Sequence, residues 1–83
     1  MNKLIENRLY SHFKGRLYYV HGLVTDSETG QEYVAYQAMY GDYKNYIRPR
    51  DMFLSEIDPG RQDNIMGQNY RFEIFEGIIK ARA

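Results

Sequence analysis

The sequence contains no cysteine and no tryptophan, and only two prolines interrupt its 83 residues. Without cysteine there is neither a disulfide nor a thiolate zinc site to support a small fold. The chain has no long apolar run that predicts a membrane span, and "MNKLIENRLY" lacks the apolar core of a signal peptide. The formal net charge is zero, which argues against strong non-specific binding to nucleic acid. We therefore expect a cytoplasmic protein without a metal or other cofactor.

Aromatic residues are abundant instead, with nine tyrosines and four phenylalanines. A chain of this length forms one domain, and it buries only about 60–65% of the surface that it exposes when unfolded. Its free energy of unfolding is therefore expected to be roughly 5 kcal/mol. Aromatic rings can supply the missing core area, and tyrosine hydroxyls need a partner or water, so we expect a thin, half-buried architecture.

Three segments rich in β-forming residues predict an antiparallel meander: 15–25, 31–40 and 45–48. Residues 54–57 are compatible with a short strand, and 70–75 alternate as a closing strand should. Pro49 ends the third strand, and 49–53 suit one helical turn whose Met52 and Phe53 plug an open end. The predicted fold is mainly β, a small SH3-like antiparallel barrel of about five strands with one or two short helical turns. Residues 1–9 are expected to form a tail or short helix, 10–76 the domain, and 77–83 a second tail.

Alternation along the meander assigns residues to two faces, if the turn after Tyr40 has two or four residues. The face predicted to form the core holds Tyr18, Val20, Gly22, Val24, Val34, Tyr36, Ala38, Tyr40 and Ile47. The second face holds Leu17, Tyr19, His21, Leu23, Tyr33, Ala35, Gln37, Met39, Tyr46 and Arg48. Because the second face is also largely apolar or aromatic, something should cover it: the curled sheet, a terminal segment or another copy of the chain. In the loop 58–69, only Ile65 and Met66 are apolar enough to act as anchors.

A candidate ligand-binding site lies on the second face, where Gln37, Tyr46 and Arg48 should come close together with Arg50 nearby. A guanidinium beside an aromatic ring can stack on a base or hold a phosphate or carboxylate. In the alternative, purely structural interpretation, Arg48 pairs with Glu28, Glu32 or another carboxylate and lies along the ring of Tyr46.

A second cationic group lies in "HFKG", where His12, Lys14 and Arg16 can form a small rim and Gly15 can expose backbone amides to an anion. Alternatively, Gly15 only begins a strand and His12 makes a hydrogen bond at a strand end, while His21 packs within the sheet. A metal held by the two histidines and a carboxylate is disfavoured, because their spacing matches no known zinc site.

Several motifs resemble one family once the strands are placed: "YSHFKGRLYYV", "ETGQEYVAYQAMYGD", "YIRPRDMF" and the later "YRF". They are similar to domain of unknown function 1653, a family of small bacterial proteins without an assigned activity. The resemblance covers Tyr10 to Phe53, with an echo at 70–72, and it implies the same small β-barrel. Matching positions are His12, Lys14, Gly15, Glu28, Tyr36, Tyr40, Gly41, Asp42, Arg48, Pro49 and Phe53. The sequence departs from the family pattern at Tyr46 (Trp in the family), Ile47 (Val) and Met39 (Leu).

The residues favour a non-enzymatic binding module that uses an aromatic and arginine surface to hold a peptide, nucleotide or nucleic acid. The alternative is a structural or interaction role, in which the aromatic face is buried in a homodimer. A small-molecule enzyme using His12 and Glu28 is a third hypothesis, but no nucleophile or paired carboxylates support it.

Overall fold

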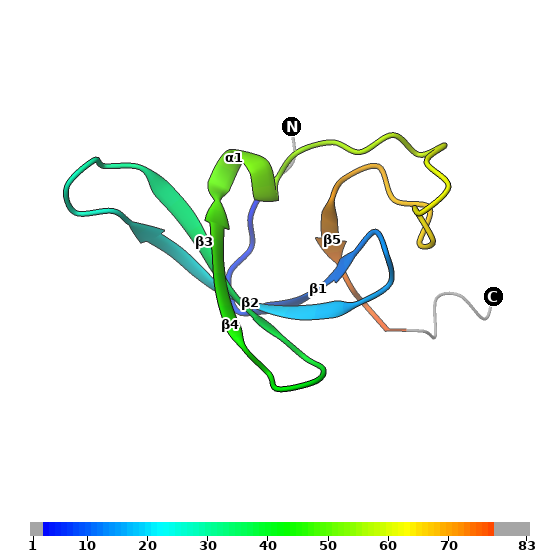
Figure 1. The fold of residues 1–83 in the computed structure, drawn as a ribbon, viewed down its shortest axis with the longest axis horizontal. Helices are drawn as coiled ribbons and strands as arrows, with labels where there is room; N and C mark the ends of the chain where they lie inside the picture. The colour runs from blue at the N-terminus through cyan, green and yellow to red at the C-terminus, as the bar shows by residue number, and fades with distance from the viewer. Residues whose placement is uncertain (1–2, 78–83) are drawn as a thin grey trace.

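The computed structural model describes residues 3–77, which form one antiparallel sheet of five strands and a short helix. The elements are β1 (Arg8–His12), β2 (Leu17–Thr25), β3 (Glu32–Ala38), β4 (Asn45–Pro49), α1 (Arg50–Phe53) and β5 (Phe72–Ile74). The order across the sheet is β4-β3-β2-β1-β5 (Figure 1). The mainly β prediction is therefore confirmed. The sheet is not closed, because β4 and β5 are its two edges in the described residues, so a barrel is not confirmed.

The first strand was not predicted, since residues up to 9 were expected to form a tail or short helix. Arg8 and Leu9 instead belong to β1 and pair with Val20 and Tyr19 of β2. On its other side β1 pairs with β5, where His12 lies opposite Phe72. The chain after Gly77 lies outside the described residues, and so does most of the predicted C-terminal tail.

A β-bulge in the middle of β2 changes the faces of that strand. Val20 pairs with Tyr36, whereas Gly22 pairs with the preceding residue of β3, Ala35. The predicted positions of Tyr18 and Val20 are therefore right, but Gly22 and Val24 lie on the opposite face. The Glu6 carboxylate occupies the space beside the bulge: a Cβ on Gly22 would lie 2.8 Å from Glu6 Oε2, and the same oxygen accepts a hydrogen bond from the Leu23 amide.

The turn between β3 and β4 has an odd number of residues, which exchanges the two faces of β4. The Ala38 amide donates to the Lys44 carbonyl, so residues 39–43 lie between the paired positions, with Gly41 and Tyr43 at positive φ. As a result Tyr46 lies opposite Tyr36, and Arg48 lies opposite Val34. The prediction that Ile47 faces the core is wrong: its side chain is 62% exposed. Tyr46 and Arg48 face inward instead, and Gln37 does not share their face.

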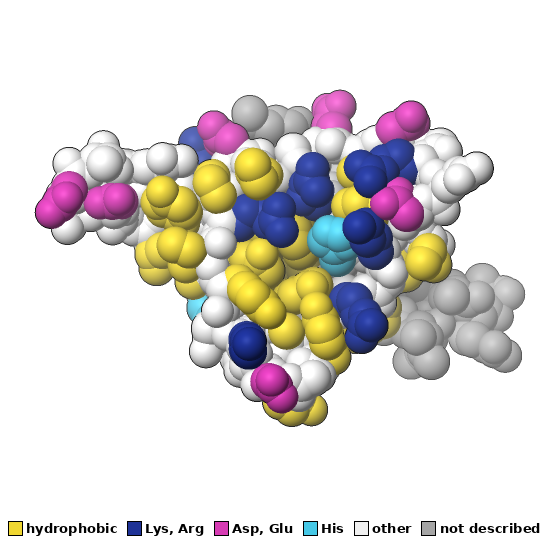
Figure 2. Space-filling model, in the orientation of Figure 1, with side chains coloured by type: hydrophobic (Ala, Val, Ile, Leu, Met, Phe, Trp, Pro, Cys, Tyr) yellow, Lys and Arg dark blue, Asp and Glu magenta, His cyan; other side chains and the backbone are white. Residues whose placement is uncertain are grey.

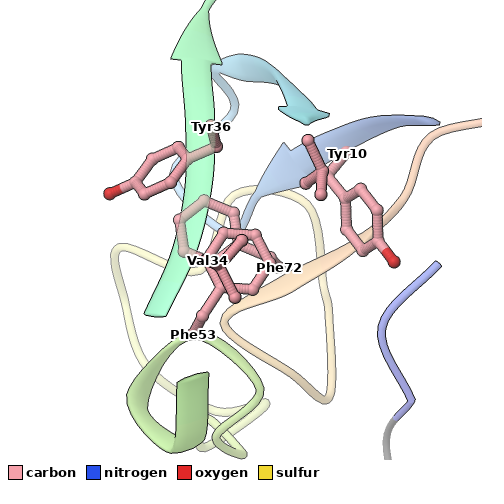
Figure 3. Close-up of a cluster of buried hydrophobic side chains, with 6 residues drawn as sticks. Tyr10, Val34, Tyr36, Phe53 and Phe72 are labelled. Carbon is pink, nitrogen blue, oxygen red and sulfur yellow. The ribbon is translucent and has the colours of Figure 1, made fainter. Parts of the chain in front are cut away.

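Aromatic rings from distant segments form the core on the inner face of the sheet. The rings of Phe53 and Phe72 stack with centroids 4.0 Å apart and an interplanar angle of 6°, and both are fully buried. Figure 3 shows this pair, from α1 and β5, beside Val34 and Tyr36 of β3. Phe53 thus fills the interior as predicted, while Met52 remains 48% exposed.

A polar pair anchors the long loop before β5. Gln68 is buried, and its amide bonds the Ser11 hydroxyl and the carbonyl oxygens of Ser11 and Tyr70. The predicted anchors are wrong, because Ile65 and Met66 are 74% and 40% exposed. The predicted strand at 54–57 is reduced to one bridge, between Glu56 and Tyr70.

Candidate functional site

The inner face of the sheet continues beyond the buried core as a row of tyrosine rings. The Tyr36 ring lies 5.4 Å from that of Tyr18 and 5.7 Å from that of Tyr46, and Tyr18 in turn contacts Tyr40 through a 2.6 Å bond between the two hydroxyls. Burial raises the pKa of Tyr18, and the bond to Tyr40 raises it further, so Tyr18 is neutral at physiological pH. Tyr46 is 43% exposed, and it brings the row to the surface.

The Arg48 guanidinium lies among these rings instead of pairing with a carboxylate. Its Nε donates to the Tyr36 hydroxyl at 3.2 Å, its Nη1 contacts the Met52 sulfur at 3.5 Å, and its Cζ lies 5.7 Å from the centroid of the Phe72 ring. No acidic residue in the described part of the chain forms an ion pair with it. The structural interpretation, in which Arg48 pairs with Glu28 or Glu32, is therefore wrong.

His12 ends β1 on the same face and is held as a neutral imidazole. Its ring packs on Phe13 and Phe72 at centroid distances of 4.3 and 4.9 Å, and its Nδ1 accepts the Lys14 amide at 3.1 Å. Its pKa is lowered to about 4, mainly by burial and in addition by the positive charges of Arg48, Arg71 and Lys14. Because Nδ1 is an acceptor, the proton of the neutral ring lies on Nε2. His12 is thus the predicted strand-end hydrogen-bonder.

Two further arginines belong to this face. Arg71 donates from Nε to the Ser55 hydroxyl at 3.2 Å, and burial and the charge of Arg48 lower its pKa. Arg16 lies with its Cζ 4.6 Å from the Tyr40 ring centroid. Neither forms an ion pair within residues 3–77. Sequence reasoning included Arg16 only as part of a rim and missed Arg71, because alternation with Phe72 would place its side chain on the other face.

We call the resulting cluster the aromatic–arginine surface. Its members are His12, Arg16, Tyr40, Tyr46, Arg48 and Arg71. Figure 2 shows basic side chains gathered around a histidine and beside hydrophobic side chains on one face of the molecule. Guanidinium groups that rest on rings keep their N–H edges available to an acceptor, so this arrangement can hold an anion next to a flat group.

The other predicted site residues lie elsewhere or have partners. Gln37 is on the outer face, where its amide donates to the Tyr43 carbonyl at 3.0 Å. Arg50 forms ion pairs with Glu32 and Asp51. Lys14 lies near His12 but also 3.8 Å from Asp63. The roles of these three residues in binding stay predictions.

Backbone amides do not form an anion cradle in "HFKG". The Gly15 amide donates to the His12 carbonyl at 2.8 Å, and the Lys14 amide is taken by His12 Nδ1. The segment is therefore a tight turn between β1 and β2, and Gly15 lies in this turn and does not begin the strand, which starts at Leu17. Any cationic contribution must come from the side chains of the segment.

No group of three or more histidines, aspartates or glutamates in residues 3–77 is placed to hold a metal ion. His21 is exposed at the bulge, not packed within the sheet, and its Nε2 bonds Asn45 at 3.2 Å. Glu28 lies in the turn between β2 and β3, which projects away from β1 in Figure 1.

Within residues 3–77 no helix has the length and apolar character to cross a membrane.

Fold and surface together define a small, single-sheet β protein with an aromatic and cationic inner face. Residues 8–74 match the family described as "Protein of unknown function (DUF1653)". The chain therefore belongs to this family, as the sequence motifs indicated, and the match extends through the later "YRF" to the end of β5. No curated protein and no solved structure matches the chain.

Proposed function

We propose that the protein is a binding module that holds an anionic ligand on the aromatic–arginine surface. The observation that supports it is the state of Arg16, Arg48 and Arg71: within residues 3–77 none of them has a carboxylate partner. Arginines that serve only the fold are usually paired or extended into solvent. These three instead lie on or beside rings, with hydrogen-bond donors left for an acceptor from another molecule.

Energetics also favour a ligand. Arg48 and Arg71 are only partly exposed, and a charge in such a position is costly unless an opposite charge or a hydrogen-bond acceptor satisfies it. The neutral His12 keeps one more positive charge out of the cluster. A bound anion would relieve the mutual repulsion of the arginines, and this gain is available only in the complex.

Chemical-shift mapping on ¹⁵N-labelled protein tests the proposal with a panel of ligands. The panel contains short single-stranded oligonucleotides, mononucleotides and acidic, neutral and basic peptides. We expect at least one anionic ligand to shift the signals of Tyr46, Arg48 and Arg71, and neutral and basic peptides to leave them unchanged. If no ligand class shifts these signals, the aromatic–arginine surface is not a binding site.

Homodimer formation is the second candidate function, and one observation favours an interface on the outer face of the sheet. Val24 and Ile47 are 43% and 62% exposed there, and β-branched apolar residues on an open sheet face favour a partner. Light scattering at high protein concentration tests this candidate. A doubled mass that returns to the monomer value in an Ile47→Lys variant supports it, and a monomer at all concentrations excludes it.

A further inference from the structure

Positive charge is concentrated around His12 although the whole chain has a net charge of zero. In addition to burial, the positive charges of Arg48, Arg71 and Lys14 lower the pKa of His12, and those of Arg48 and Arg61 lower the pKa of Arg71. Asp63 is the carboxylate that opposes this effect at His12, and it is already bound by Arg61 at 2.8 Å. Acidic side chains that balance the charge lie elsewhere, for example in the turn with Asp26 and Glu28. The surface therefore suits a ligand with more than one negative charge.

The exposed ring of Tyr46 lies at one edge of this positively charged cluster. Tyr46 is tilted by 34° against Tyr36, which supports one side of its ring, while the exposed part is open to stacking by a planar group. The Arg48 guanidinium, held by the Tyr36 hydroxyl, lies two positions along the same strand and on the same face. A ligand that contacts both residues needs a flat group to stack on Tyr46 and an anionic group to bind Arg48.

Among polyanions, single-stranded nucleic acid combines both features in each repeat. Its unpaired bases stack on aromatic side chains while basic side chains follow the phosphates, and this combination is sequence-tolerant. An acidic peptide supplies carboxylates but no flat group next to them, and in a duplex the faces of the bases are already covered. The neutral His12 adds a donor at Nε2 that no described residue uses, and it can bond a phosphate oxygen.

Resting on the binding function proposed above, we infer that the ligand is single-stranded nucleic acid, with a base stacked on Tyr46 and phosphates at Arg48 and Arg71. The whole chain has a net charge of zero, so affinity depends on this local cluster and not on a general attraction. The site differs from the usual non-specific one in that stacking, and not only charge, is required.

Fluorescence anisotropy with labelled oligothymidylate at low salt tests the inference. The competitors are an abasic oligomer of the same length, a thymidine mononucleotide and an aspartate-rich peptide. We expect the abasic oligomer to bind at least about five-fold more weakly, which is the lower end for loss of one stacked base. The mononucleotide and the peptide should compete more weakly still, because each lacks either the repeated phosphates or the base.

Matched variants locate the contacts. Tyr46→Ser should weaken binding by roughly 5- to 100-fold and Tyr46→Phe should retain it, because stacking needs the ring and not the hydroxyl. Tyr19→Ser removes a tyrosine ring from the outer face and is the matched control, so it should weaken binding less than Tyr46→Ser does. Arg48→Gln should lower the slope of log affinity against log salt by about 0.7, the value for one phosphate contact. Arg50→Gln, two positions away, removes an arginine that is already paired with Glu32 and Asp51, so it should change the slope by less than Arg48→Gln does.

Three results would overturn the inference: an abasic oligomer, a mononucleotide or an acidic peptide that binds as tightly as the oligonucleotide. If such a ligand still depends on Arg48, the binding function stands and only the ligand class is wrong. Equal losses for Tyr46→Ser and Tyr19→Ser would also remove the stacking role. If no panel member binds, the proposed function itself fails, so the two failures are distinguishable.

Discussion

The neutral state of His12 makes the stability of the protein depend on pH. The pKa of His12 is lowered from 6.5 to about 4, mainly by burial and in addition by the charges of Arg48, Arg71 and Lys14, while Asp63 opposes them. In the unfolded chain the imidazole takes up a proton below pH 6.5, but in the folded protein it does so only near pH 4. Unfolding therefore binds a proton between these values, and the free energy of unfolding falls as the pH is lowered from 6.5 towards 4.

The size of the effect follows from the two pKa values. The difference between 6.5 and about 4 corresponds to about 3 kcal/mol if it is fully realised. The imidazole is only half-buried, so solvent screens part of the effect. We expect a loss of about 1 kcal/mol between about pH 7.5 and about pH 5, a range that lies above the titration of most carboxylates.

Urea unfolding followed by circular dichroism at both pH values measures this loss. His12→Asn removes the titration but keeps a side-chain oxygen that can accept the Lys14 amide, so its free energy of unfolding should change less with pH than that of the wild type. His21→Asn, at the exposed second histidine, should behave like the wild type. An unchanged pH dependence in His12→Asn, or an NMR titration of His12 centred at or above pH 6.5, would refute the reasoning.

Three substitutions test the packing. Phe53→Ala should cost about 3–5 kcal/mol, which is enough to unfold most of a domain with roughly 5 kcal/mol of stability; a two-state urea curve close to that of the wild type would contradict the stacked core. Ile47→Thr should change the free energy of unfolding by less than about 0.5 kcal/mol, because its side chain is 62% exposed; a loss of several kcal/mol would return Ile47 to the core. Gly22→Ala should cost about 1–3 kcal/mol, since its φ is +154° and the new Cβ would meet Glu6; calorimetry would show an unchanged melting temperature if the bulge were absent.

Local patterns in the sequence predicted the centre of the fold. The β-forming segments around Val20 and Val34 became β2 and β3, and Pro49 ended β4 as its missing amide requires. Phe53 was placed in the interior on the same grounds. Each of these features depends on neighbouring residues, and the sequence shows them directly.

Two kinds of feature were not predicted: those that depend on distant partners, and those that depend on whether a turn or strand has an odd or even number of residues. β1 is a strand because its residues lie between β2 and β5, and β5 is about 60 residues away in the chain. One extra residue at the Gly22 bulge and an odd turn after Ala38 each reverse a strand's faces, because side chains alternate with a period of two. The buried pair Ser11 and Gln68 joins β1 to the loop before β5 and has no local signal.

The candidate site was predicted in part. Tyr46 and Arg48 were singled out from the sequence, but they lie on the inner face and not on the face predicted for them. His12, for which no face was predicted, lies on the inner face as well. Gln37 was included only because the register was wrong. Arg71 was missed because its approach to Arg48 depends on the pairing of β5 with β1.

The most direct test of the aromatic–arginine surface is a set of intermolecular NOEs in a complex with oligothymidylate. We predict NOEs from thymine protons to the ring of Tyr46, together with restricted exchange of the Arg48 side-chain N–H signals. NOEs confined to outer-face residues such as Tyr19 or Ile47, or a spectrum unchanged by the oligonucleotide, would contradict the account.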